Sequence, residues 1–384
     1  MGEEGAASTE ANGDALSSPG VMSGEGYYAH HSITQHGAAA LGLPLVGPCV
    51  DGLVLPPGDG PLTMGDLGAA QGGNSLAAFA AALDALGRRA PGRPVLVVHS
   101  DLPTNDFATL FDVVETSPDS YLRGRSGVFP LVAGRVLYQR IFPAGQLAFG
   151  WTASTLHWLS SPPCPVEGHF FAQLSHDEAA KRAYAARSRQ DWADFLACRA
   201  VELAPGAGVV LVDVAMDEDG LMGSEALFDA LNDALRAVHA AGVLDDDELA
   251  RLVYPTWFRS VEELSAPFRP YAVGPGGERL DLVDVTPTRL GDPFRAAFER
   301  DGDAGAYAQA QVGFLRGFLQ PSFAAVLDRR RAPGERDRVL ASVWQEAATR
   351  IAAGPSRCFA DYRLVTARVR RLAEDDPTTR GGDG

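Results

Sequence analysis

This chain of 384 residues is poor in cysteine and in positive charge, and both shortages exclude classes of protein. The four cysteines, Cys49, Cys164, Cys198 and Cys358, are scattered without a Cys-x-x-Cys pair, which argues against a zinc site and favours a reducing, cytoplasmic location. Lysine and arginine number 33 against 49 acidic residues. With a net charge of −16 the chain repels phosphate backbones, so we expect no nucleic-acid partner.

Long apolar runs are absent as well. No stretch of about 18 apolar residues occurs, so no membrane span is expected. The N-terminus lacks the basic and apolar segments of a signal peptide. Residues 1–20 and 374–384 have a composition typical of disordered tails. Hydrophobic residues still make up 46% of the chain, which is enough for a large core.

Short apolar segments alternate with helical patterns between residues 28 and 215. Strands are expected at 62–67, 95–99, 128–132, 147–151 and 209–214, and helices at 28–41, 76–89 and 191–203. This alternation predicts an α/β fold with a mostly parallel, doubly wound sheet, in a core that spans residues 21–215.

The pattern changes after residue 215. Helices are expected at 224–241, 245–252, 291–330 and 335–353, and strands at 270–275, 279–285 and 362–369. A helical cap made of residues 216–265 and 290–355 fits this order, with 266–289 and 356–373 as the remaining core strands. Such a cap would cover the carboxyl edge of the sheet and close a pocket there.

Acidic residues follow two neighbouring expected strands. Asp66 precedes a glycine turn, and Asp101 comes directly after the apolar run at 95–98. Ligands of open α/β sheets bind at the carboxyl edge, so this pair predicts a nucleoside site. Alternatively, each aspartate is separately a helix N-cap or a turn residue.

The glycine spacing separates two nucleoside cofactors. A dinucleotide site needs Gly-x-Gly-x-x-Gly with an acid about 20 residues further on. The loop here reads Gly68-Ala-Ala-Gln-Gly72-Gly73, and Asp101 is much farther along, so a nicotinamide dehydrogenase is a distant alternative. The spacing better suits S-adenosylmethionine. Asp101 would accept hydrogen bonds from the ribose, Leu102 would pack on adenine, and Asp66 would lie near the cationic methionine end.

Several segments follow one another in a recognisable order between residues 22 and 265. They are Tyr28-Ala-His-His-Ser32-Ile-Thr-Gln35, Asp66-Leu-Gly with Gly73-Asn74, Asp101-Leu-Pro-Thr-Asn105-Asp106-Phe107, Tyr138-Gln-Arg140-Ile-Phe142-Pro143 with Ser154-Thr-Leu156-His157-Trp158-Leu159-Ser160, Phe195-Leu-x-x-Arg199-Ala-x-Glu202-Leu-x-Pro205-Gly206, and Tyr254-Pro-x-x-x-x-Ser260-x-Glu262-Glu263. In this order they resemble the carboxyl methyltransferases that act on salicylic acid, benzoic acid and theobromine precursors (the SABATH family). The high Ala, Arg and Gly content favours a bacterial member.

The resemblance implies a Rossmann-like class I methyltransferase core, S-adenosyl-L-methionine as cofactor, a small carboxylic acid as substrate, and a homodimer. Gln35 and Trp158 would hold the substrate carboxylate through side-chain N–H groups. The implied cofactor contacts are Tyr28, Ser32, Asp66, Gly68, Asn74, Asp101, Leu102, Val136 and Leu137. The implied pocket wall consists of Trp151, Ser154, His157, Phe228, Leu315, Phe318 and Tyr362.

The chain departs from the family pattern at three places. Val136-Leu137 replaces a common Ser-Phe pair, so that serine contact is lost or comes from the backbone. Ser154 stands where salicylate-type members have a tyrosine, and Trp151 replaces a common histidine. The pocket walls therefore differ, and the substrates of the plant enzymes cannot be assumed.

The chemistry that this resemblance implies needs no general base. A carboxylic acid with a pKa of about 4 is ionised at neutral pH, so its oxygen can displace the methyl group in line. Gln35 and Trp158 are neutral donors, which orient a carboxylate without an ion pair that would weaken its nucleophilicity. We therefore expect the methyl ester of a small, largely apolar, aromatic acid as the product.

Other interpretations stay open for single residues and for the whole protein. Gln35 alone fits an exposed helix position, Trp158 alone fits core packing, and His157 is either pocket wall or a base for an N–H or phenol nucleophile. His30 and His31 point to different helix faces, so no metal is expected. The alternative functions are N- or O-methylation of a heteroaromatic compound and a catalytically idle, ligand-binding homologue.

Overall fold

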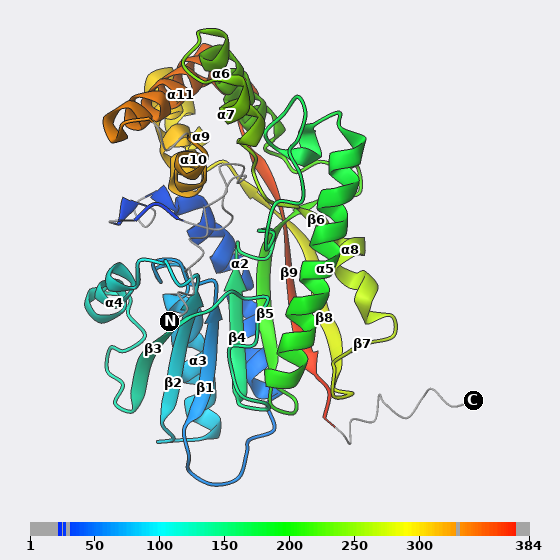
Figure 1. Ribbon diagram of the computed structural model, residues 1–384. Coiled ribbons are helices and arrows are strands. Elements are labelled where there is room, and N and C mark those ends of the chain that lie inside the picture. The colour runs from blue at the N-terminus through cyan, green and yellow to red at the C-terminus, as the bar shows by residue number, and fades with distance from the viewer. Residues whose placement is uncertain (1–21, 25, 28–30, 328–330, 374–384) are drawn as a thin grey trace, which may run out of the picture.

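In the computed structural model, residues 22–24, 26–27, 31–327 and 331–373 are described, and they form one large sheet with helices around it (Figure 1). The strands are β1 (Leu62–Leu67), β2 (Val95–Asp101), β3 (Val128–Gly134), β4 (Leu147–Ala153), β5 (Gly208–Met216), β6 (Arg259–Ser260), β7 (Ala272–Val273), β8 (Arg279–Gly291) and β9 (Asp361–Arg371). Their order is β3-β2-β1-β4-β5-β9-β8-β7, with β6 paired to β5 off this path. Strands β1 to β5 run parallel, and β9 is antiparallel to both β5 and β8.

Helices cover both faces of the sheet. On one face α2 (Ile33–Asp51) contacts β4, β5 and β9 and packs beside α3 (Leu76–Arg89). On the other face α5 (Glu178–Glu202) contacts β7 and β8, and Figure 1 shows it in front of the sheet, with α2 and α3 behind it. The short helix α4 (Phe107–Thr116) follows β2 and contacts β3. The predicted Rossmann-like, mostly parallel, doubly wound sheet is confirmed.

Burial along the strands explains their apolar sequences. Strands β4 and β5 are central and are buried along nearly their whole length, as their continuous apolar runs require. Strand β3 is at the edge of the sheet and exposes Phe129 and Leu131 to solvent. The carboxyl ends of the central strands therefore meet at one well-covered edge of the sheet.

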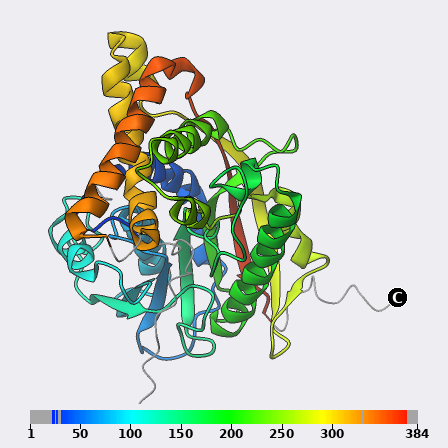
Figure 2. The same cartoon turned by 45° about the horizontal axis from the view of Figure 1, so that its top comes forward.

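A group of helices with its own apolar core lies beyond one end of the sheet (Figures 1 and 2). It contains α6 (Glu225–Ala240), α7 (Asp246–Arg251), α10 (Ala304–Val326) and α11 (Pro333–Ala353). Helix α11 packs against both α6 and α10. The short helices α8 (Val261–Ser265) and α9 (Arg295–Asp301) and the 3₁₀ turns Ala172–Leu174, Ala266–Phe268 and Pro355–Arg357 complete the fold. We call the helices α6, α7, α10 and α11 the cap.

Several predicted element boundaries were wrong. Helix α5 begins at Glu178, capped by Asp177, and not at the expected residue 191. Helix α2 continues to Asp51, ten residues beyond the expected end, although Pro44 and Pro48 lie inside it, because its packing against the sheet overrides the local effect of proline. Strand β8 continues to Gly291 because a bulge, with Asp284 at a φ of 56°, restores its pairing with β9. The expected helix at 291–330 is divided at Gly302, which has a φ of 69° and caps α9.

Several expectations concern composition and the chain ends. No helix among the described residues is long and apolar enough to cross a membrane. The four cysteines are all described, and all are free thiols. The part of the chain that the structure covers holds no group of three potential metal-ligating side chains. The predicted tails at 1–20 and 374–384 and the predicted cofactor contact Tyr28 lie outside the described residues.

Candidate active site

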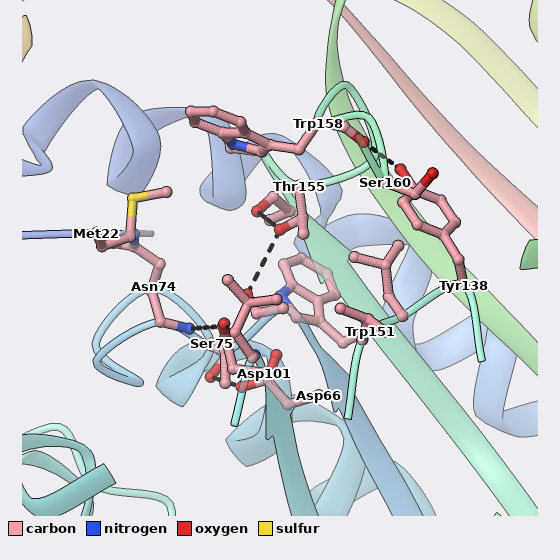
Figure 3. A pocket seen from close by; sticks show the side chains of 18 of the residues that line it. Met22, Asp66, Asn74, Ser75, Asp101, Tyr138, Trp151, Thr155, Trp158 and Ser160 are labelled. Atoms are coloured by element: carbon pink, nitrogen blue, oxygen red, sulfur yellow. Dashed lines mark hydrogen bonds between the residues drawn. The ribbon is translucent and has the colours of Figure 1, made fainter. Parts of the chain in front are cut away.

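A first cavity of about 870 Å³ opens at the carboxyl ends of β1, β2 and β4 (Figure 3). Its walls include the last residues of these strands, the glycine turn after β1, and two loops. The predicted cofactor contacts that line it are Asp66, Gly68, Asn74, Asp101, Leu102, Val136 and Leu137. Seven of the residues predicted to contact the cofactor therefore line the same cavity.

The glycine turn is tightly built. Gly68 has a φ of +89°, and a Cβ atom there would lie 2.2 Å from a side-chain carbon of Thr155. Ala70 also has a positive φ, 46°. The backbone N–H of Ala70 donates to Asp101 Oδ2 at 2.7 Å, and the Asn105 amide donates to the Ala70 carbonyl at 2.7 Å. These bonds join the turn after β1 to the end of β2 and give Asn105 a structural role that its motif did not reveal.

The carboxyl group of Asp101 is positioned by its own loop. Its Oδ1 accepts from the Leu102 backbone N–H at 2.7 Å. Burial raises the pKa of Asp101 to about 6, although the N–H groups of Ala70 and Leu102 partly offset that effect. A carboxyl group on a cavity wall with a raised pKa needs further donors to be stable as a carboxylate. The two hydroxyls of a ribose supply such donors, so this wall fits the nucleoside part of S-adenosylmethionine.

Asp66 is held from behind by a buried hydrogen-bond chain. Its Oδ2 accepts from the Ser75 hydroxyl at 2.6 Å and lies 2.8 Å from His99 Nδ1. His99 Nε2 in turn lies 2.8 Å from the hydroxyl of Tyr121. His99 and Tyr121 are fully buried. This hydrogen-bond chain could not be predicted from the sequence, because nothing in the residue spacing relates Tyr121 to Asp66.

Residues 136–142 form the loop that supplies Val136 and Leu137 to the first cavity, and a buried ion pair holds this loop. Arg199 and Glu202 lie one helical turn apart on α5, are fully buried, and approach to 2.7 Å. Arg199 donates to the carbonyls of Leu137 and Gln139, at 3.0 and 2.9 Å. Glu202 accepts from the backbone N–H groups of residues 141 and 142, at 2.5 and 3.1 Å. The motif around Arg199 therefore positions the cavity wall and contacts no ligand itself.

A second cavity of about 600 Å³ adjoins the first and lies between the sheet edge and the cap. Met22, Ser154 and Trp158 line both cavities, so the two adjoin at these residues. The other lining residues are Thr34, Gln35, Ala38, His157, Val214, Ser224, Phe228, Tyr254, Phe258, Leu290, Phe314, Phe318, Tyr362 and Leu364. Gln35 Oε1 is buried and has no hydrogen-bond partner among the described residues. The amide therefore has an unused hydrogen-bonding position there, which its NH₂ group occupies when the amide is turned by 180°.

Three predicted site residues lie elsewhere than expected. Trp151 lines the first cavity and not the second, because on β4 it pairs with Asp66 of β1. Leu315 lines neither cavity and is fully buried in the cap core, whereas Phe314 and Phe318 of the same helix line the second. Ser32 lines neither cavity and lies at the N-cap of α2.

The sequence also missed some wall residues. Phe314 could have been found, since it lies one turn before Phe318 on the same helix. Thr34 could not have been found in this way, because it is adjacent to Gln35 in α2 and neighbouring helix residues do not share a face. Ser224 could not, because it belongs to a segment whose place depends on the cap.

His157 makes a hydrogen-bonded pair at the second cavity. Its Nδ1 lies 2.7 Å from Asp213 Oδ1, and both residues are buried. Asp213 is on β5, and the short strand β6 pairs with the end of β5, at Ala215 and Met216. When neutral His157 donates from Nδ1 to Asp213, its Nε2 is left as an acceptor.

The segment at 154–160 that carries Trp158 is fixed at several points. Tyr138 donates its hydroxyl hydrogen to the Trp158 carbonyl, and the backbone N–H of Trp158 donates to Thr155 at 3.1 Å. Ser160 donates twice to Asp191, from its backbone and its hydroxyl, at 2.8 and 2.7 Å. Figure 3 shows the Trp158 indole above the first cavity, opposite Asp66 and Asp101. Hydrogen bonds to the backbone of Trp158 and to Ser160 therefore hold the Trp158 ring at the place where the two cavities adjoin.

A cavity at the carboxyl ends of the central strands of a Rossmann-like sheet, next to an apolar cavity under a cap, fits an S-adenosylmethionine-dependent methyltransferase. The family model described as SAM dependent carboxyl methyltransferase matches residues 20–269. The chain belongs to this family, whose cofactor is S-adenosylmethionine.

Curated relatives agree with this assignment at modest identity. Methyltransferase LUC1 of Fusarium sp is 28% identical over 63% of this chain, which spans 65% of that protein's length. Jasmonate O-methyltransferase of Arabidopsis thaliana is 26% identical over 69% of this chain and 75% of its own. Salicylate carboxymethyltransferase of Clarkia breweri is 24% identical over 75% of this chain and 80% of its own length.

A solved structure has the same fold. Loganic acid methyltransferase with SAH superposes with a TM-score of 0.74 over 92% of this chain and 99% of that one, at 17% identity. At this identity the likeness shows the fold alone.

Proposed function

We propose that this protein transfers the methyl group of S-adenosylmethionine to the carboxylate of a small acid with an aromatic or other apolar body. The observation that carries the proposal is the shared wall. Met22, Ser154 and Trp158 line both cavities, so a cofactor in the first and an acid in the second would meet there. Phe228, Phe318 and their neighbours give the second cavity an apolar surface that suits such a body.

Gln35 and Trp158 orient the acid in this proposal. The Gln35 amide N–H and the Trp158 indole N–H would each donate to a carboxylate oxygen and leave the attacking lone pair free. Bound S-adenosylmethionine supplies an electrophilic methyl group on a positively charged sulfur. The protein's contribution is alignment and exclusion of water, and positioning of this kind can lower a barrier by roughly 7–11 kcal/mol.

A second candidate function is supported by the His157–Asp213 pair. A neutral His157 with its Nδ1 hydrogen on Asp213 presents Nε2 as an acceptor, which is what a phenol or heteroaromatic N–H would need before methylation. For a carboxylate, which has no proton to lose, the same histidine would only form part of the wall. The His157–Asp213 pair therefore matters for methylation of a phenol or an N–H group and not for methylation of a carboxylate.

The experiment is a methyl-transfer assay with labelled S-adenosylmethionine and a panel of carboxylic acids, phenols and heteroaromatic N–H compounds. Carboxyl methylation gives a methyl group that mild alkali releases as methanol, and N- or O-alkylated products resist that treatment. His157→Gln should keep the rate of ester formation within about tenfold of that of the unchanged protein. If His157 is the general base for a phenol or N–H acceptor, the same change should lower the rate of methyl transfer to that acceptor roughly 10²–10⁴-fold. Binding of S-adenosylhomocysteine without transfer to any acceptor would support an idle homologue.

We also propose a homodimer in the cytoplasm, as the family resemblance and the cysteine usage suggest. The four free thiols suit a reducing compartment. Light scattering of the purified chain measures its mass directly, and a monomer at micromolar concentration would contradict the dimer.

A further inference from the structure

Three hydroxyl groups line the second cavity, and none has a hydrogen-bond partner outside this group. Among the described residues, the side-chain oxygens of Thr34, Ser224 and Tyr362 are buried; the Ser224 hydroxyl is unpaired, and Thr34 and Tyr362 have only each other. These residues are only 7, 4 and 5% exposed. A buried polar group without a partner is costly and uncommon in native proteins. Three hydroxyls with unused hydrogen-bonding positions on one otherwise apolar wall indicate a ligand that completes their hydrogen bonds.

The hydroxyl of Ser224 is not needed by the local structure. Ser224 is the N-cap residue of α6, where a serine side chain normally accepts from the first turn, but it makes no such bond. The carboxylate of Glu225 instead accepts from the backbone N–H groups of Met222 and Gly223. The start of α6 is thus secured by Glu225, and the Ser224 hydroxyl remains on the cavity wall.

The three groups lie near one another. The backbone N–H of Asp361 donates to Gly223 at 2.7 Å, so the segment before α6 runs beside the start of β9 and brings Ser224 close to Tyr362. A hydrogen bond between the side chains of Thr34 and Tyr362 lowers the pKa of Tyr362, although burial raises that pKa by more. The phenol therefore stays protonated at neutral pH and can donate.

The charge around this cluster favours a neutral ligand group. No lysine or arginine belongs to the described lining of the second cavity. The nearby carboxylate of Asp292, which accepts from Tyr307 at 2.6 Å and from Gln311 at 2.8 Å, further raises the pKa of Tyr362. A second carboxylate or a phosphate would meet this negative charge without a compensating cation.

We propose that the methyl acceptor carries, besides its carboxylate, a neutral hydroxyl or carbonyl oxygen that Thr34, Ser224 and Tyr362 bind. The inference rests on the proposed function, because it assumes that the carboxylate faces Gln35 and Trp158. Thr34, Ser224 and Tyr362 line the second cavity and not the first, so this oxygen belongs to the acid and not to the cofactor. A site built to hydrogen-bond a substrate oxygen rejects an analogue that lacks it.

The first test is binding to the full chain saturated with S-adenosylhomocysteine. Calorimetry would give the Kd of cinnamate, its three monohydroxy isomers and 4-formylcinnamate, a series that moves the oxygen around one apolar body. At least one oxygenated acid should bind roughly tenfold or more tightly than cinnamate. If none binds more tightly, the inference is wrong, whether or not methyl transfer occurs.

The second test uses the ratio of affinities for the preferred oxygenated acid and cinnamate. This ratio should fall towards one in Tyr362→Phe, Ser224→Ala and Thr34→Val. The matched control is Thr152→Val, which removes a buried, unpaired hydroxyl from β4 outside both cavities and should keep the ratio. A preference that survives all three cavity substitutions overturns the inference. If the oxygenated acid binds more tightly and the three cavity variants lose this preference, but no ester is ever formed, only the proposed function is refuted.

Discussion

Asp101 Oδ2 accepts the backbone N–H of Ala70 at 2.7 Å, so a hydrogen bond joins the end of β2 to the glycine turn after β1. This bond places the carboxyl group of Asp101 on the first cavity beside the turn that would enclose the cofactor. The affinity for the nucleoside should therefore depend on that carboxyl group more than on any other single side chain of the cavity.

Asp101→Asn should weaken S-adenosylhomocysteine binding roughly 10- to 100-fold, which corresponds to about 1.5–3 kcal/mol for hydrogen bonds to a charged group. Calorimetry measures the change. Asp112→Asn is the matched control, since Asp112 is exposed on the neighbouring α4. An unchanged Kd for Asp101→Asn would refute the ribose assignment.

Cofactor binding should also depend on pH near the pKa of Asp101, which burial raises to about 6. Above that pH the carboxylate can accept ribose hydroxyls. As the pH falls through about 6 the free protein takes up a proton that binding must expel, so the affinity should fall towards a slope of tenfold per pH unit. Titrations between pH 5 and 8 test this, and Asp101→Asn should lose the break near pH 6. A break of equal size in that variant would assign the titration to another group.

Trp158→Phe should raise the KM for the acid roughly tenfold, because the ring remains but the indole N–H that would hold the carboxylate is lost. The Kd for S-adenosylhomocysteine should change little, although Trp158 touches both cavities. Trp344→Phe is the control: it makes the same change in the cap core, where the indole N–H has no partner among the described residues. Equal losses in acid and cofactor binding would show that Trp158 is structural.

The Arg199–Glu202 pair should be needed for the cofactor wall. Arg199→Met leaves Glu202 buried without its partner and should cost about 3–5 kcal/mol in urea unfolding. Arg140→Met is the control, since Arg140 is 3.5 Å from the same carboxylate but about half exposed, and should cost less than about 1 kcal/mol.

The double variant Arg199→Met/Glu202→Leu separates the ion pair from its loop contacts. If the pair alone matters, removing both charges should restore stability. We expect the affinity for S-adenosylhomocysteine to stay low, because the backbone groups of the loop at 136–142 lose their partners.

The sequence predicted the sheet and the cofactor side of the site because local patterns determine both. Apolar runs specify β1, β2, β4 and β5, and Asp66, Gly68 and Asp101 directly follow or end those runs. The acid side was harder to predict. Ser224, Phe314 and Tyr362 come from different parts of the chain, and only the packing of the cap brings them to one cavity. Leu315 shows the same limit, since its neighbours on α10 line the cavity and it does not.

The central claim is that an oxygen of the acid attacks the methyl group directly. An acid with ¹⁸O in both carboxyl oxygens and S-adenosylmethionine with a deuterated methyl group test it in one mass spectrum. Direct attack by a carboxylate oxygen should give an ester that carries the labelled methyl group and both ¹⁸O atoms. An ester that has lost one ¹⁸O, or a labelled product whose methyl group resists mild alkali, would contradict it.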